Sequence, residues 1–221
     1  MLHKESLEFL KALSQNNNRE WFTANKSWYE NSKKDVESLV AKIIPAIATF
    51  EPSIANLDPK KCLFRIYKDV RFSPDKRPYK TNFGIIFASR SSENLAGYYM
   101  HISPEECFLS CGHYMLRPDQ LKTMRKGIYE NFDALQEILN EKQFKKVIGD
   151  FYRDEDALQR VPNGFDKNHP AAEYLKLKHF YVWKPFSENE LFSDDFVEYA
   201  AGIYKIMKPL KDYLNEMLSE Q

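Results

Sequence analysis

The sequence contains few glycines and none of the common phosphate-loop patterns. Only seven of its 221 residues are glycine, and neither GxGxxG nor GxxxxGK[ST] occurs. These loops need glycine where the backbone approaches a phosphate, so their absence argues against a nucleotide-binding fold of either kind. The patterns G-x-S-x-G and HExxH and the spaced acids of an EF-hand are missing as well. The common hydrolase classes therefore lose support.

An excess of charge of either sign is also absent. Lys and Arg together number 32, as do Asp and Glu, so the formal net charge is zero. Non-specific binding to nucleic acids or to membrane surfaces depends on a basic excess. The composition therefore disfavours nucleic acid as a partner, predicts no membrane binding, and requires any anion site to be local.

Cysteine is scarce, and long apolar runs are missing. The three cysteines, Cys62, Cys107 and Cys111, form no CxxC pair, which fits a reducing compartment. No segment approaches the roughly 18 apolar residues of a membrane span. Cys107, Cys111 and His113 share one strand face, but they are spread along it and a fourth ligand is missing. We expect a cytoplasmic protein with no metal site and no cofactor.

The chain does carry enough apolar residues for a substantial core. Apolar residues make up 43% and aromatic residues 14%, so residues 1–221 are predicted to form a single domain. These patterns predict an α+β fold, with a mainly antiparallel sheet of about five strands and N-terminal, middle and C-terminal helices packed on one face. Helical periodicity marks residues 6–13, 26–50, 118–148 and 196–214, and strand patterns mark 63–66, 82–89, 97–103, 106–113 and 179–186.

The alternation of side chains along the strands predicts one apolar face and one mixed face. It assigns Phe64 and Ile66 to the apolar face, and Arg65, Tyr99 and His101 to the mixed face. The mixed face is therefore the expected floor of a binding site.

Residues 60–80 are the most cationic segment of the chain. Their Lys and Arg side chains are opposed only by Asp69 and Asp75, and Pro74 and Pro78 restrict the backbone. Closely spaced guanidinium and ammonium groups suit a phosphate or a carboxylate. The residues predicted to bind the ligand are Arg65, Tyr67, Arg71, Lys76, Arg77, Tyr79, Lys80 and Asn82.

Other interpretations of the same residues stay open. The cationic segment could be a solvated loop whose arginines pair with acidic helices elsewhere. His101 and Asp69 are candidate catalytic residues, with His101 as a proton carrier near neutral pH and Asp69 orienting it or an arginine. The alternative for His101 is a structural, hydrogen-bonded side chain.

Four motifs carry a resemblance that covers nearly the whole chain. They are RIYKDVRFSPDKRPYKTNFG from Arg65 to Gly84, NNNREWF at 16–22, YYMHISPEECFLSCGHYMLRPDQL at 98–121 and VPNGFDKNHPAAEYL at 161–175. Together they resemble an uncharacterised family, domain-of-unknown-function family 2461. The resemblance implies an α+β fold but no activity. The motif positions that it selects are Arg65, Asp69, Arg71, Lys76, Pro78, Tyr79, Lys80 and Gly84.

One departure from the family pattern is visible after the 97–113 hairpin. The family often has a glycine pair or triplet there, whereas this chain has Ser110, Cys111 and Gly112. A close backbone approach at the first two positions is therefore in doubt.

The sequence thus predicts a cytosolic pocket protein that recognises a small anionic ligand through the segment from Arg65 to Gly84, with or without a reaction. A second hypothesis is an interaction module for single-stranded nucleic acid or an acidic protein, and a third is a structural scaffold without a small ligand. The oligomeric state stays open. The second hypothesis relies on base stacking by Phe64, Tyr67, Phe72 and Tyr79.

Overall fold

The computed structural model describes residues 1–71, 74–88 and 96–219. Phe72, named above for base stacking, and Ser89, at the end of a predicted strand, lie outside the described residues. The contacts divide the chain into two compact units. Unit 1 contains the described residues of Met1–Ser89, Tyr99–Leu109 and Pro185–Gly202, and unit 2 those of Arg90–Tyr98, Ser110–Lys184 and Ile203–Gln221. The single domain over 1–221 stays a prediction.

The described strands form one antiparallel sheet, which confirms the α+β class. Its strands, in the order β1-β2-β3-β4, are β1 (Phe83–Phe87), β2 (Gly97–Ile102), β3 (Cys107–His113) and β4 (Phe180–Pro185). Burial alternates along β2: Met100 and Ile102 are buried, whereas Tyr99 and His101 are half-buried. The predicted division into an apolar and a mixed face therefore holds for this strand.

The sheet has four strands in the described part of the chain rather than the predicted five. The segment 63–66 makes only an isolated antiparallel bridge from Leu63 to Ile85, and a second bridge joins Tyr67 to Tyr79. The two bridges differ in register by about two residues, so no continuous ladder forms between them. This shift also overturns the expected burial of Phe64, which is 50% exposed.

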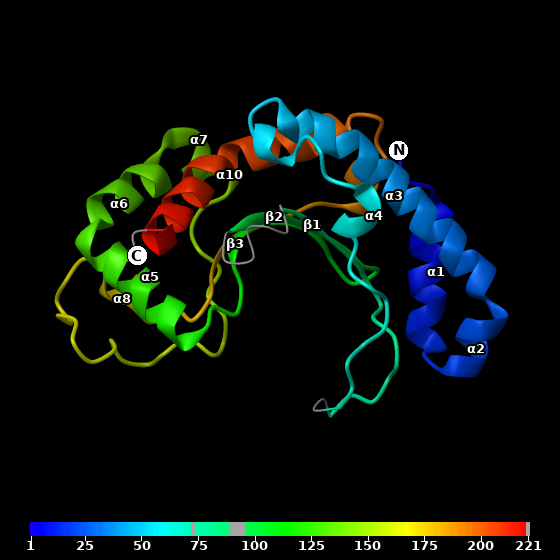
Figure 1. The fold of residues 1–221 in the computed structure, drawn as a ribbon, viewed down its shortest axis with the longest axis horizontal. Helices are drawn as coiled ribbons and strands as arrows, with labels where there is room; N and C mark the ends of the chain where they lie inside the picture. The colour runs from blue at the N-terminus through cyan, green and yellow to red at the C-terminus, as the bar shows by residue number, and fades with distance from the viewer. Residues whose placement is uncertain (72–73, 89–95, 220–221) are drawn as a thin grey trace. The chain divides into compact units, whose positions relative to one another are not determined.

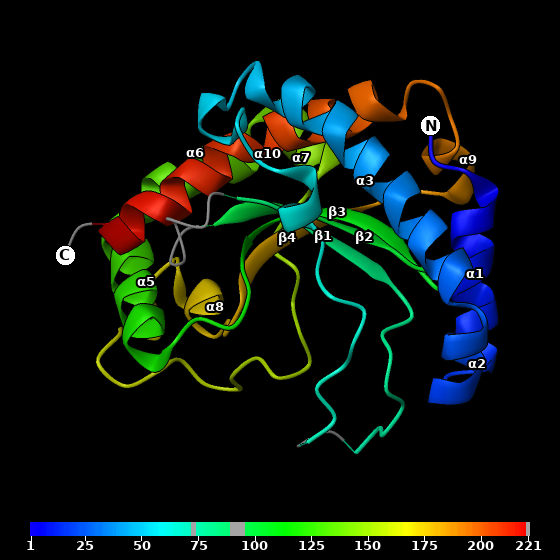
Figure 2. The same cartoon turned by 45° about the vertical axis from the view of Figure 1, so that its right-hand side comes forward.

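Unit 1 contains the N-terminal helices. α1 and α3 lie side by side (Figures 1 and 2), and both have a continuous buried apolar stripe. Asn18 caps α2 by accepting a hydrogen bond from the backbone N–H of Trp21 at 2.9 Å. The helices are α1 (Lys4–Gln15), α2 (Arg19–Ala24), α3 (Lys26–Ala48), the 3-10 turn η1 (Pro52–Ile54), α4 (Pro59–Cys62), α9 (Glu188–Leu191) and the first part of α10 (Phe196–Ser219).

Unit 2 contains the middle helices and the rest of α10. α5 contacts both α6 and α8, and the ring centroids of Tyr98 in β2 and Tyr204 in α10 lie 5.0 Å apart. The helices are α5 (Pro118–Glu130), α6 (Phe132–Asn140), α7 (Lys142–Val147) and α8 (Ala172–Leu175). That the helices of the whole chain pack on one face stays a prediction. Within the described ranges, no helix is both long and apolar enough to cross a membrane.

Candidate functional site

The cationic motif forms an extended hairpin, residues 63–85, which leaves α4, runs away from the sheet and returns as β1 (Figure 1). Backbone hydrogen bonds join its described arms. The N–H of Phe64 donates to the carbonyl of Gly84 at 2.9 Å, and the N–H of Lys80 donates to that of Ile66 at 2.8 Å. These bonds fix the backbone conformation from which the charged side chains extend, although the two arms do not form a regular β-ladder.

The second arm of the hairpin is fastened to the N-terminal helices through Tyr79. The Asn17 amide donates to the Tyr79 carbonyl at 2.9 Å and accepts from the Tyr79 N–H at 3.1 Å. The Tyr79 ring stacks on Phe22, with centroids 4.0 Å apart and planes at 14°. Tyr79, predicted to contact ligand, is only 6% exposed and belongs to this anchor. Asn17 was missed by the sequence reasoning, and its only signal was its place in the NNNREWF motif.

Three of the six cations of the hairpin are paired with carboxylates of the same hairpin. Arg71 binds Asp69 at 2.7 Å, and Asp75 binds both Arg77 and Lys68 at 2.8 Å. Hydrogen bonds from the arginine side chains hold the pKa of both aspartates below its ordinary value. The ion pairs of these two arginines are therefore formed with aspartates of the same hairpin.

Three other predicted ligand residues lie apart from these ion pairs. The Lys76 ammonium donates to the backbone carbonyl of Val70 at 3.0 Å. Tyr67 is 55% exposed, with its ring centroid 6.2 Å from that of Phe22, and Asn82 is half-buried. The structure thus does not bring the eight predicted residues into one cluster.

Arg65 and Lys80 differ from the ion-paired Lys68, Arg71 and Arg77. Neither forms an ion pair with any residue that the structure describes. The Lys80 ammonium lies 5.4 Å from the ring centroid of Phe64. Burial lowers the pKa of Lys80, and the charge of the neighbouring Arg65 lowers it further. The charge of Arg65 therefore raises the positive potential at Lys80, which a bound anion would relieve.

An aromatic surface adjoins this pair of cations. The ring of Phe64 lies 6.2 Å from that of Tyr99 in β2, and His101 stacks on Phe108 with centroids 4.8 Å apart. A Cβ at Gly84 would lie 2.8 Å from the Tyr99 hydroxyl and 2.9 Å from the Phe64 ring. Gly84 therefore lets these two side chains approach the backbone closely, and a Cβ there would require them to shift.

The two candidate catalytic residues are not brought together. Asp69 hydrogen-bonds Arg71, whereas His101 shares a 2.9 Å hydrogen bond between its Nδ1 and the Tyr99 hydroxyl. Burial lowers the pKa of His101 to about 4 and raises that of Tyr99 to about 12. Both side chains are then neutral near pH 7, which supports the structural alternative for His101; the catalytic role stays a prediction.

Acidification is expected to destabilise the protein through buried histidine. The folded-state pKa of His101 is about 4, against about 6.5 in an unfolded chain, so only the unfolded chain binds a proton between these values. Stability present above pH 6.5 is therefore lost as the pH falls toward 4. Replacing His101→Gln should recover about 2 kcal/mol of the loss between about pH 7 and pH 5, measured by urea unfolding.

Part of the pH dependence will remain in that variant because burial also lowers the pKa of His113 to about 4. The prediction for His101 is contradicted if the variant and the natural protein lose the same free energy of unfolding over this pH range.

One group of potential metal ligands lies in unit 2, among the residues described: Asp154, Asp156 and His179. The Nδ1 atom of His179 accepts a hydrogen bond from the Met115 N–H at 3.0 Å. The proton of the neutral ring is then on Nε2, 3.5 Å from Asp156, and the Tyr181 hydroxyl donates to Asp154 at 3.0 Å. These atoms already satisfy one another without an ion. That the protein has no metal site stays a prediction.

Comparison with known proteins gives one result. A family model described as conserved hypothetical protein (DUF2461) matches residues 5–213. No curated protein matches the chain, and no solved structure matches it either.

Proposed function

Because the chain belongs to this family of conserved hypothetical proteins (DUF2461), a membership that carries no activity, we propose a function from the geometry of the hairpin. The protein is a cytosolic binding protein for a small anionic molecule. The phosphate or carboxylate of that molecule contacts Arg65 and Lys80, and its organic part packs on the aromatic surface of Phe64 and Tyr99.

The observation that carries the proposal is the difference between these two cations and their neighbours. Arg71, Arg77 and Lys68 are ion-paired within the hairpin, so their charges are already compensated. Arg65 and Lys80 form no ion pair in the described parts of the chain, although the charge of Arg65 contributes to the lowered pKa of Asp69. The two cations lie close enough for Arg65 to lower the pKa of Lys80. A guanidinium offers two parallel donors to an oxyanion, and an ammonium adds a point charge.

The aromatic surface gives the proposed site its second property. The half-exposed ring of Phe64 presents apolar area that burial against a ligand would remove from water. The adjoining Tyr99 and His101 are neutral at pH 7, so they add no charge to the surface against which the organic part would pack. The site therefore suits an anion that has an apolar or planar part.

Titration calorimetry with pyrophosphate and with benzoate tests the proposal. We expect saturable binding of at least one of them, and a Kd that rises about tenfold in each of Arg65→Ala and Lys80→Ala, because each loses a charge-assisted hydrogen bond. The control is Arg71→Ala, which removes the same charge from the same hairpin, but from a residue already paired with Asp69. It should change the Kd by about twofold or less.

Equal losses of affinity in all three variants would indicate a general charge effect and contradict the proposal, as would the absence of saturable binding. A salt titration separates it from the interaction-module hypothesis. Binding to a single-stranded oligonucleotide that falls steeply with salt and exceeds the affinity for both small anions would favour the module.

A further inference from the structure

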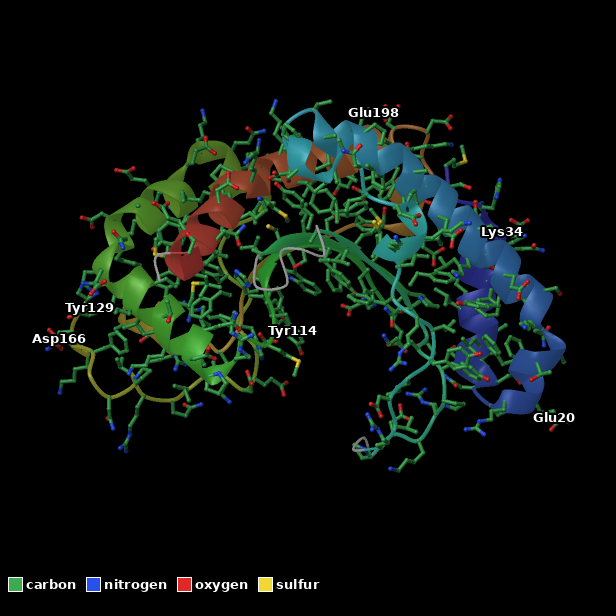
Figure 3. All side chains as sticks on the ribbon, viewed as in Figure 1. Glu20, Lys34, Tyr114, Tyr129, Asp166 and Glu198 are labelled. Atoms are coloured by element: carbon green, nitrogen blue, oxygen red, sulfur yellow. The ribbon has the colours of Figure 1, made fainter. Side chains whose placement is uncertain are left out.

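Unit 2 contains a cavity that the hairpin site does not involve. Its volume is about 460 Å³, within the range of roughly 300–1,000 Å³ of small-molecule sites. The cavity lies between α5 and the loop at 162–165, which belongs to the motif VPNGFDKNHPAAEYL. Figure 3 shows Tyr129 on α5 beside the loop that carries Asp166.

The loop is held on α5 by ring contacts. The Tyr129 ring lies 5.3 Å from that of Phe165 and 4.1 Å from that of His169. Gly164 has φ +92°, and a Cβ there would meet no atom within 4 Å. Glycine is thus needed for the turn itself rather than for packing, and the turn places the residues on either side of it at the cavity.

Cations from one face of α5 line the cavity. Arg125 and Lys126 lie three and four residues after Lys122, so both lie on the same side of the helix as Lys122. Glu130 is the one carboxylate residue among the lining residues, and it lies 3.8 Å from Lys126. The lining therefore has an excess of two positive charges in a protein whose net charge is zero.

Arg125 has unused hydrogen-bonding capacity. Its Nη2 donates to the carbonyl of Leu177 at 2.9 Å, which fixes the guanidinium, whereas its buried Nε has no partner in the described chain. Buried donors are nearly always hydrogen-bonded in native proteins, so this Nε is a donor that a small shift of the guanidinium would offer to a ligand or a water in the cavity. Burial also lowers the pKa of Arg125, as expected for a charge that no anion compensates.

Apart from Asn163 and Gly164, the remaining lining residues of the cavity are apolar or aromatic. Pro118 and Pro162 contribute apolar surface, and Tyr129 and Phe165 contribute aromatic rings. A ligand that fits this lining has a compact doubly charged anion at one side and a flat apolar body at the other.

From the cavity, the charge excess and the unpartnered Nε of Arg125, we propose that unit 2 binds a phosphate monoester of a small aromatic molecule. A phosphate monoester carries nearly two negative charges near pH 7, which matches the excess of two positive charges better than a carboxylate does. Arg125 contacts the phosphate, Lys122 and Lys126 surround it, and the aromatic part lies against Tyr129 and Phe165. This site is separate from the one proposed on the hairpin and does not depend on it.

Nuclear magnetic resonance with phenyl phosphate as the probe tests this inference. We expect the backbone amides of α5 and of residues 163–165 to shift on titration, together with the Nε–H signal of Arg125, which is assigned by its loss in Arg125→Lys. The double variant Lys122→Ala/Lys126→Ala, at two exposed positions, should raise the Kd about tenfold or more. Benzoate and inorganic phosphate should each bind more weakly than phenyl phosphate.

The matched control is Lys142→Ala, an exposed lysine on α7 outside the cavity lining, which should leave the Kd unchanged. The variant Arg65→Ala/Lys80→Ala should leave the shifts of α5 unchanged, so failure of either proposed site is recognised separately. The inference is overturned if phenyl phosphate at millimolar concentration shifts none of the α5 signals, or if the lysine double variant binds it as tightly as the natural protein does.

Discussion

Replacement of Gly112→Ala is expected to lower the free energy of unfolding by about 4 kcal/mol or more, or to prevent folding. Gly112 in β3 has φ +136°, a conformation that residues with a side chain rarely adopt. A Cβ there would lie 2.1 Å from the carbonyl oxygen of Phe180 and 2.6 Å from the Cα of Tyr181. Because both atoms belong to the backbone of β4, relief of the clash requires the two strands to separate.

Urea unfolding followed by far-ultraviolet circular dichroism measures this effect. The control is Gly202→Ala in α10, where a Cβ would meet no atom within 4 Å and alanine favours the helix. That variant should be more stable by up to about 1 kcal/mol. A Gly112→Ala protein within about 1 kcal/mol of the natural one would show that β3 and β4 are not so closely paired.

Replacement of Phe22→Ala is expected to cost about 3 kcal/mol of stability and to loosen the hairpin. Phe22 is 4% exposed, and its ring lies 5.2 Å from that of Tyr29 and 4.0 Å from that of Tyr79. Truncation would leave a cavity between α2, α3 and the hairpin. Since Lys80 follows Tyr79, affinity for a small anion at the hairpin should fall as well.

Amide hydrogen exchange is the direct measurement for the second part of this prediction. The N–H of Lys80, which donates to the carbonyl of Ile66, should exchange faster in Phe22→Ala. Phe22→Leu retains most of the buried volume and should cost less than about 1.5 kcal/mol. Unchanged exchange at Lys80 in a destabilised Phe22→Ala protein would show that the stacked rings do not hold the hairpin.

Local sequence patterns correctly predicted those parts of the fold whose structure depends mainly on residues close in the sequence. The alternation of Tyr99, Met100, His101 and Ile102 correctly assigned each side chain of β2 to a face. The same rule was wrong for Phe64, because a change of register between two bridges moved that residue out of the alternation. Alternation holds only while a strand stays paired without interruption.

The chemistry of the cationic segment was predicted from its composition, but its charge pairing was not. Arg71 and Arg77 each bind the aspartate two residues before them, a contact whose distance depends on the conformation of the hairpin. That geometry separates Arg65 and Lys80 from the other cations. Residues 60–80 contain eight positively charged side chains, and only the fold shows which of them are ion-paired.

By itself, the sequence determined the α+β class, the family and the location of a cationic motif, since these depend on local periodicity and residue type. Only the tertiary structure decided which cations are ion-paired and which residues anchor the hairpin that carries them. Asn17 and Tyr79 are 62 positions apart and meet through hydrogen bonds between the Asn17 side chain and the Tyr79 backbone. These bonds do not depend on which side chain the second residue carries. The cavity beside Arg125 likewise exists only where a distant loop packs on α5. Contacts between distant residues depend on how the chain is packed, and no local pattern of residue types records them.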